Sequence, residues 1–107
     1  MITTHVLDTT SGRPAAGIPV TLEFQLSEQE WKQVGTGQTD EDGRTRTLVP
    51  EGMQLARGVY RLLFNVESYQ QSFYPEIVVV FRVENPNEHY HVPVLLSKFG
   101  YTTYRGS

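Results

Sequence analysis

The stretch Val20-Thr21-Leu22-Glu23-Phe24-Gln25-Leu26 alternates apolar and polar residues without interruption. Successive side chains of a β-strand point to opposite faces, so a period of two is typical of a strand with one buried face. The turn formers Gly17 and Pro19 precede it, as expected where a strand begins. The stretch therefore predicts a protein built around half-buried strands.

The rest of the chain repeats this signal. Apolar or alternating runs are separated by short segments rich in Gly, Pro, Asn and Asp, which favour turns. The one candidate helix lies between Glu67 and Phe73, spans at most about two turns and ends before Pro75. This spacing predicts an all-β antiparallel sandwich of seven to eight strands with at most one short helix. The predicted strands span residues 2–8, 20–26, 31–39, 44–48, 58–66, 77–83, 89–97 and 101–107.

Three of these strands carry further information. Gly35 and Gly37 interrupt residues 31–39, which indicates a bulge or a sheet edge. The pair Asp42-Gly43 predicts a tight hairpin turn from which Arg44 emerges. Residues 58–66 are apolar on both faces, so we expect this strand inside the assembly.

The bulk properties exclude several classes of protein. The 107 residues fit a single domain, residues 1–107. The net charge is −3 and no Lys or Arg cluster is present, which argues against nucleic-acid and membrane partners. The absence of Cys excludes a disulfide scaffold and a thiol nucleophile. Because no basic segment and apolar run open the sequence, we expect a cytoplasmic protein, with periplasmic export left open if a signal peptide was removed.

The segment around His89 and His91 places histidines on an unusual face. Strand alternation puts Tyr90, Val92, Val94 and Leu96 on the core face and His89, His91, Pro93 and Leu95 on the opposite one. That opposite face is too apolar for plain solvent exposure, and such faces commonly cover another subunit. We therefore expect His91 at a subunit interface, where symmetry would repeat it.

Simpler interpretations remain for these residues. His91 can be a hydrogen-bonded histidine at a sheet edge, without chemistry. The His-Tyr-His spacing also fits two ligands of a zinc ion, but no carboxylate on that face supplies a third. Arg44 can be a cation beside an acidic turn, either solvated or weakly paired with Asp40 or Asp42.

The chain finishes with Tyr104-Arg105-Gly106-Ser107, directly after an apolar segment. Chain ends are usually frayed and polar, whereas this tail carries an aromatic ring, a cation and a hydroxyl. We expect it to be packed.

Taken together, these motifs resemble the transthyretin-related 5-hydroxyisourate hydrolases, over essentially the whole chain. The terminal Tyr-Arg-Gly-Ser is the most specific piece, because it separates these enzymes from transthyretin, the hormone carrier of the same prealbumin-like fold. The resemblance rests on Thr4-His5-Val6-Leu7-Asp8, Gly12-Arg13-Pro14-Ala15, Asp42-Gly43-Arg44, His89-Tyr90-His91-Val92-Pro93, Leu95-Leu96-Ser97 and Tyr101-Thr102-Thr103-Tyr104-Arg105-Gly106-Ser107.

The resemblance implies a homotetramer, a dimer of dimers with active sites in a central channel. It implies hydrolysis of 5-hydroxyisourate to 2-oxo-4-hydroxy-4-carboxy-5-ureidoimidazoline in urate degradation, without a cofactor or metal. Carried onto this sequence, the catalytic residues are His5, Arg44 and His91, and the substrate-binding residues are His5, Arg44, Tyr104 and Ser107. The alternative is a non-enzymatic, transthyretin-like carrier of a small ligand.

Two histidines and an arginine can supply what such a hydrolysis needs, namely an activated water, a proton for the leaving nitrogen and a charge for the oxyanion. Either His5 or His91 can be the base in this hypothesis. Two departures from the family pattern affect loops. Lys98 stands where proline is usual, so the turn there loses a fixed φ, and the connection over residues 67–76 looks shorter.

Overall fold

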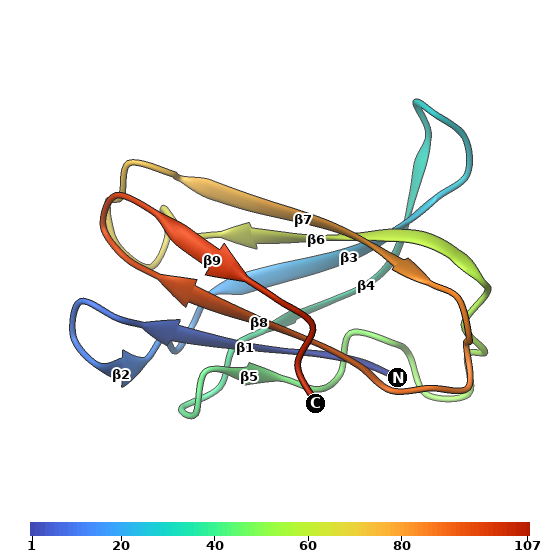
Figure 1. Cartoon of the computed structure of the whole chain (residues 1–107), viewed down its shortest axis with the longest axis horizontal. Coiled ribbons are helices and arrows are strands. Elements are labelled where there is room, and N and C mark those ends of the chain that lie inside the picture. The colour runs from blue at the N-terminus through green and yellow to red at the C-terminus, as the bar shows by residue number, and fades with distance from the viewer.

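The computed structural model describes all 107 residues and contains nine strands and no helix. Figure 1 shows two sheets packed face to face. One has the order β2-β1-β8-β9, with β5 also paired to β1, and the other has the order β4-β3-β6-β7. The predicted all-β sandwich is confirmed. Its strands are β1 (Ile2–Asp8), β2 (Arg13–Pro14), β3 (Pro19–Gln25), β4 (Trp31–Gln38), β5 (Arg44–Thr45), β6 (Gly58–Asn65), β7 (Glu76–Val83), β8 (Tyr90–Leu96) and β9 (Tyr101–Thr103).

The core lies between the sheets and follows the alternation of the sequence. Eighteen buried apolar residues form one cluster, to which β3 contributes Val20 and Leu22 and β8 contributes Val92 and Val94. Burying each such side chain contributes roughly 1.5–3 kcal/mol. The strand β6 lies between β3 and β7, which confirms the interior position expected from its two apolar faces.

One strand pair departs from the antiparallel prediction. The strands β1 and β8 run parallel, with Ile2 opposite Tyr90 and Asp8 opposite Leu96. The other strand pairs of both sheets are antiparallel. Parallel partners need a long connection between them, and here almost the entire chain separates the two strands. Local sequence patterns could not predict this pairing.

The turn before Arg44 forms where it was predicted, but the strand after it has another partner. The backbone N–H of Gly43 donates to the Asp40 carbonyl over 2.9 Å. Gly43 has φ of 76° and is packed so tightly that a β-carbon would overlap the Val6 carbonyl oxygen. No other residue type fits both constraints. The following β5 pairs with β1 instead of forming a hairpin with β4, and this places Arg44 beside His5.

The helix expected between Glu67 and Phe73 is absent. A single turn forms, in which the N–H groups of Tyr69 and Gln70 both donate to the Val66 carbonyl. The helix does not continue, because the Phe73 N–H donates to the Lys98 carbonyl instead of to a carbonyl within the segment. The Tyr69 hydroxyl also ties this turn to Asp8, over 2.9 Å. No element has the helical length and hydropathy needed to cross a bilayer.

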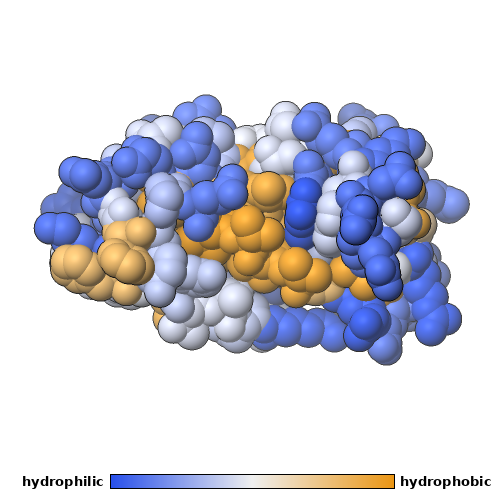
Figure 2. Space-filling model, turned by 90° about the horizontal axis from the view of Figure 1, so that it is seen from above, coloured by the Kyte–Doolittle hydropathy of each residue, from blue (hydrophilic) through white to orange (hydrophobic).

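Both edges of the four-stranded sheet are informative. In β4, the predicted irregularity is a shift of register opposite Leu22 and Glu23 that leaves Val34 without a partner. The opposite edge, β7, exposes Val78 and Val80 at 39% and 58%. Figure 2 shows apolar surface gathered along the middle of the molecule when it is seen from this side.

Candidate active site

The outer face of the five-stranded sheet collects the polar side chains that the sequence singled out. Thr3 lies opposite His91 and His5 opposite Pro93 in the pairing of β1 with β8. On the other edge of β1, His5 lies opposite Arg44 of β5. Neighbours in register point to the same side of a sheet, so His5, Arg44 and His91 share the face opposite the core. This confirms the predicted orientation of His91.

His91 is half-buried, and its imidazole is held by a neighbouring strand. The Thr3 hydroxyl lies 2.8 Å from His91 Nδ1. Desolvation by burial lowers the pKa of His91 below its usual 6.5, and the nearby charges of Arg44, His5 and His89 lower it further, against a raising effect of a hydrogen bond with the Thr3 backbone. A neutral imidazole at neutral pH can accept a proton.

Arg44 has a free guanidinium. The three ion pairs of the chain join Arg46 to Asp40, Arg61 to Glu23 and Arg105 to Glu88. No ion pair joins the Arg44 side chain to Asp40 or Asp42, so of the two simpler interpretations only the solvated cation fits. Only the backbone N–H of Arg44 donates to Asp40, over 3.0 Å. A guanidinium without a carboxylate partner is available to bind an anionic or oxygen-rich ligand.

A hollow of about 280 Å³ opens beside these groups. It is shallow and faces solvent in the isolated chain. The side chains around it are mostly cationic or hydroxylated, which suits a small polar anion. Its lining consists of Met1, Thr3, Thr4, Arg44, Arg46, His89, His91 and Ser107.

The C-terminal tail contacts His91 through Gly106, but the prediction of a packed tail is only partly correct, because Tyr104, Arg105 and Ser107 are exposed. The Gly106 N–H donates to the His91 carbonyl over 2.8 Å, and the two residues form an isolated antiparallel bridge. Upstream, the Arg105 guanidinium lies 4.6 Å from the centre of the Tyr90 ring and 3.4 Å from Glu88. These contacts hold the tail so that Ser107 lies beside the hollow.

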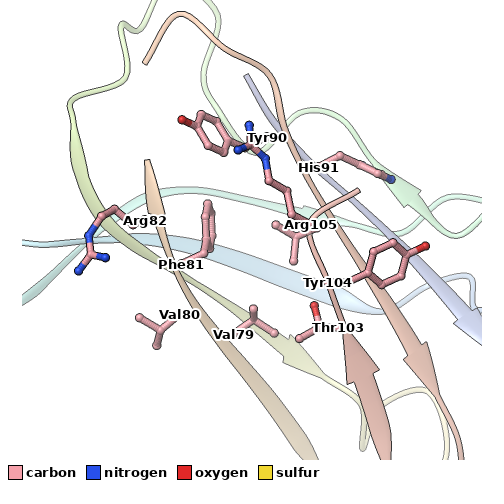
Figure 3. Close-up of a pocket in the computed structure, with 10 residues that line it drawn as sticks. Val79, Val80, Phe81, Arg82, Tyr90, His91, Thr103, Tyr104 and Arg105 are labelled. Atoms are coloured by element: carbon pink, nitrogen blue, oxygen red, sulfur yellow. The ribbon is translucent and has the colours of Figure 1, made fainter. Parts of the chain in front are cut away.

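Tyr104 does not line the hollow that Arg44, His91 and Ser107 share. It lines a second, more apolar hollow of about 230 Å³ between β7 and the tail, together with Val79, Phe81 and His91. Figure 3 shows the rings of His91 and Tyr104 both pointing away from Val79 and Phe81. Tyr104 is 56% exposed, so its ring is free to meet a ligand or another subunit.

The structure thus brings Arg44, His91 and Ser107 around one hollow. His5 shares their face and lies beside Arg44 in register, but it does not line the hollow. Thr3, whose hydroxyl contacts two histidines, was not among the predicted site residues. Thr3 and His5 alternate along one strand in the same way as His89 and His91 alternate along the other. This pattern identifies Thr3 as a neighbour of the histidines only once the parallel pairing of the two strands is known.

The site has no arrangement that would bind a metal through protein ligands alone. No group of three or more His, Cys, Asp or Glu side chains converges anywhere in the structure. His89 and His91, the pair that fitted a zinc site, have ring centres 6.4 Å apart, and both face Thr3.

Comparison with known proteins shows which family this chain belongs to. The model of the HIUase/Transthyretin family matches residues 2–106. The chain belongs to the HIUase/Transthyretin family. Among relatives of this family, the 5-hydroxyisourate hydrolase of Salmonella dublin is 47% identical over 112 residues, which cover 100% of this chain and 81% of that protein. The 5-hydroxyisourate hydrolase of Mus musculus is 44% identical over 112 residues, which cover 99% of this chain and 94% of that protein.

Solved structures of the HIUase/Transthyretin family have the same fold. Transthyretin from Sparus aurata superposes with a TM-score of 0.87 at 31% identity, covering 98% of this chain and 95% of its own. The 5-hydroxyisourate hydrolase of Klebsiella pneumoniae superposes with a TM-score of 0.82 at 26% identity, covering 99% and 98%. Backbone similarity is therefore high both to a transthyretin and to a hydrolase, so the fold does not decide between the two functions.

Proposed function

We propose that this protein is a 5-hydroxyisourate hydrolase that opens the substrate to 2-oxo-4-hydroxy-4-carboxy-5-ureidoimidazoline in urate degradation. The observation that carries the proposal is the grouping of His91, Arg44 and Ser107 around one hollow. It occurs in a chain 47% identical over its whole length to a 5-hydroxyisourate hydrolase.

The product identifies the bond that must break. It gains a carboxylate and a ureido group, so the cleaved bond joins a ring carbonyl carbon to the nitrogen that becomes part of the urea. Water attacks the carbonyl carbon, the carbonyl oxygen becomes an oxyanion, and the nitrogen leaves with a proton. The site must therefore provide a base, a cation and a proton donor.

His91 and Arg44 divide this work in the proposed mechanism. His91, whose pKa is lowered chiefly by desolvation, is neutral at pH 7 and removes a proton from the attacking water. It then returns a proton to the leaving nitrogen. Arg44 binds the oxygen-rich ring and stabilises the oxyanion, because its guanidinium has no carboxylate partner in the chain.

His5 and the tail complete the proposed site. His5 lies beside Arg44 in register, where it can hold the water or relay its proton. Ser107 lines the hollow, and its hydroxyl can fix the ring by a hydrogen bond. Tyr104 lies on the tail next to His91, and its exposed ring can close over the substrate and exclude water.

We also propose that the protein assembles as a homotetramer, a dimer of dimers. Two apolar surfaces support this assembly. Leu95 is half-buried on the outer face of β8, and Val78 and Val80 are exposed on the unpaired edge β7. Sedimentation should give a mass near four times the 12.2 kDa of one chain, and a monomer at assay concentrations would contradict the assembly.

A carrier function is the second candidate, since transthyretins have the same fold and one solved sea bream transthyretin holds thyroxine. The polar groups of the site favour a small anion over a large apolar hormone. Generating 5-hydroxyisourate with urate oxidase and following its absorbance separates the two functions. We expect faster decay with the protein than without it, and the uncatalysed rate with His91→Ala. A decay unaffected by the wild-type protein would reject the hydrolase and favour the carrier.

A further inference from the structure

The hydroxyl of Thr3 lies between two imidazoles. Its oxygen is 2.8 Å from His91 Nδ1 and 2.8 Å from His89 Nε2. Thr3 is 7% exposed, so water competes poorly for these contacts. The rings are steeply inclined, at 75°, and each turns one nitrogen toward the same oxygen.

We propose that Thr3 is a positioning residue that fixes the tautomer of His91 and connects it to His89 as a proton outlet. The inference rests on the proposed hydrolase function. It assigns Thr3 and His89, which have no role in the mechanism above.

The hydrogen bonds through Thr3 couple the tautomers of His91 and His89. A hydroxyl donates one hydrogen bond and accepts up to two, and a neutral imidazole has one donor and one acceptor nitrogen. If His91 Nδ1–H donates to the Thr3 oxygen, the Thr3 hydroxyl is free to donate to His89 Nε2. His91 Nε2 is then unprotonated and available as a base. The reverse arrangement protonates His91 Nε2, so the two histidines cannot choose their tautomers independently.

The same geometry permits transfer of an excess proton. In the hydrolysis, the proton that His91 Nε2 takes from water returns to the leaving nitrogen. The carboxylic acid product then ionises at neutral pH, so one further proton must leave the site. When His91 Nε2 takes that proton, His91 becomes an imidazolium with protons on both nitrogens. The Nδ1 proton moves to the Thr3 oxygen while the Thr3 hydroxyl proton moves to His89 Nε2. His91 is then neutral, and the charge resides on His89, from which a proton passes to solvent. Exchange with water returns the His91 proton to Nδ1 before the next turnover.

His89 is suited to release that proton. It is exposed, whereas His91 is half-buried, so an imidazolium is better solvated at His89. The charges around His91 act in the same direction, because Arg44 and His5 both disfavour a cation there. The titratable and charged groups around His91 come from several elements. They are His5 from β1, the amino group of Met1 before it, Arg44 and Arg46 from the β5 region, Arg82 from β7, His89 from the segment before β8, and Tyr104 and Arg105 from the tail.

The decisive variants are Thr3→Val and Thr3→Ser. Valine keeps the shape and β-branching of threonine without the hydroxyl, and serine keeps the hydroxyl. We expect Thr3→Val to lower kcat about 10-fold or more, a part of the contribution of general acid–base catalysis, with a smaller change in KM. Thr3→Ser should restore most of kcat. The acid limb of the Thr3→Val pH profile should move to lower pH, because the oxygen that accepts from protonated His91 is missing.

A matched control is Thr45→Val. Thr45 is 2% exposed, and its hydroxyl has no hydrogen-bond partner. This variant makes the same chemical change in a buried strand of the same sheet, and it should keep wild-type kcat. In the double variant Thr3→Val with His89→Gln, the second change should cost little beyond the first, because the connection is already broken.

The tautomer can be measured without substrate. Long-range ¹H–¹⁵N spectra of the three histidines should show wild-type His91 protonated on Nδ1 near neutral pH and a different tautomer distribution in Thr3→Val. An unchanged His91 tautomer, or wild-type kcat and pH profile in Thr3→Val, would overturn the proposal. If the wild-type protein does not hydrolyse 5-hydroxyisourate, the hydrolase function fails, whereas these spectra still test the link between Thr3 and His91. Circular dichroism of Thr3→Val and Thr3→Ser separates unfolding from loss of the hydroxyl.

Discussion

Gly106 is hydrogen-bonded to His91 through a backbone contact of 2.8 Å, and a β-carbon on Gly106 would lie 2.6 Å from His91 Cδ2. The tail and the imidazole therefore occupy adjoining space with no room for a methyl group. The position of Ser107 and the orientation of His91 depend on the same glycine.

Replacing this glycine should damage the site and spare the fold. Gly106→Ala must displace either the tail or the His91 ring, so we expect a large loss of kcat/KM with an unchanged melting temperature. Gly100→Ala is the control, since the nearest atom to its new β-carbon would be 3.7 Å away, an ordinary contact. Equal activity of the two variants would show that the tail does not position the site.

Arg44→Ala should lower kcat by about 10²-fold, the scale of removing one group that stabilises an oxyanion. Its guanidinium takes part in no ion pair, so stability should change little. Arg57→Ala, at an exposed position remote from the hollow, controls for the loss of a positive charge. Near-wild-type turnover of Arg44→Ala would remove Arg44 from the mechanism.

The pH dependence of the reaction should reflect the lowered pKa of His91. Desolvation, with the charges of Arg44, His5 and His89, keeps the ring neutral below its usual pKa of 6.5. The acid limb of kcat/KM should therefore lie below pH 6.5, and Arg44→Gln should move it to higher pH. The unfolded chain binds more protons than the folded chain in this range, so His91 lowers stability as the pH falls through 6.5. An acid limb above pH 6.5 would contradict this assignment.

Tyr69→Phe tests a contact at the other end of the sandwich. Burial alone would raise the pKa of Asp8, but hydrogen bonds from Tyr69, Ser11 and Thr10 outweigh it and hold that pKa below its usual 3.8. Losing the tyrosine donor should cost roughly 1.5 kcal/mol of unfolding free energy at pH 7, as for hydrogen bonds to charged groups.

The loss in Tyr69→Phe should diminish as the pH falls through the folded-state pKa of Asp8, because the carboxylate is then protonated. Denaturant titrations at neutral and acidic pH measure this. Tyr74→Phe is the control, because the Tyr74 ring packs against Tyr101 and its hydroxyl makes no hydrogen bond within the chain. A constant difference across pH would exclude Asp8 as the cause.

The sequence pattern predicted those features of the fold that depend on residues close together in the chain. The alternation in residues 20–26 placed β3 to within one residue at each end. The alternation around His91 assigned both faces of β8 correctly, because a period of two leaves only one choice once the core face is known.

The remaining features depend on contacts between distant residues. The segment after Val66 forms one turn, but the Phe73 N–H donates to the distant Lys98 carbonyl instead of continuing a helix. The turn at Lys98 closes without proline, through the Ser97 N–H and hydroxyl on the Gly100 carbonyl. The role of Thr3 also stayed hidden, since nothing near it in sequence indicates that it lies beside His91.

The parallel pairing of β1 with β8 affects how the protein acquires its activity. Thr3 and His91 are 88 positions apart, so the site joins β1 to a strand that leaves the ribosome much later. Contacts of such separation close slowly, because most of the chain must lose its freedom before they form. During synthesis, β1 is complete long before β8 has been made, so its apolar side chains stay exposed until β8 emerges. Catalytic competence should therefore appear in one late step, after β8 and the tail have emerged, and no shorter nascent chain can be partly active.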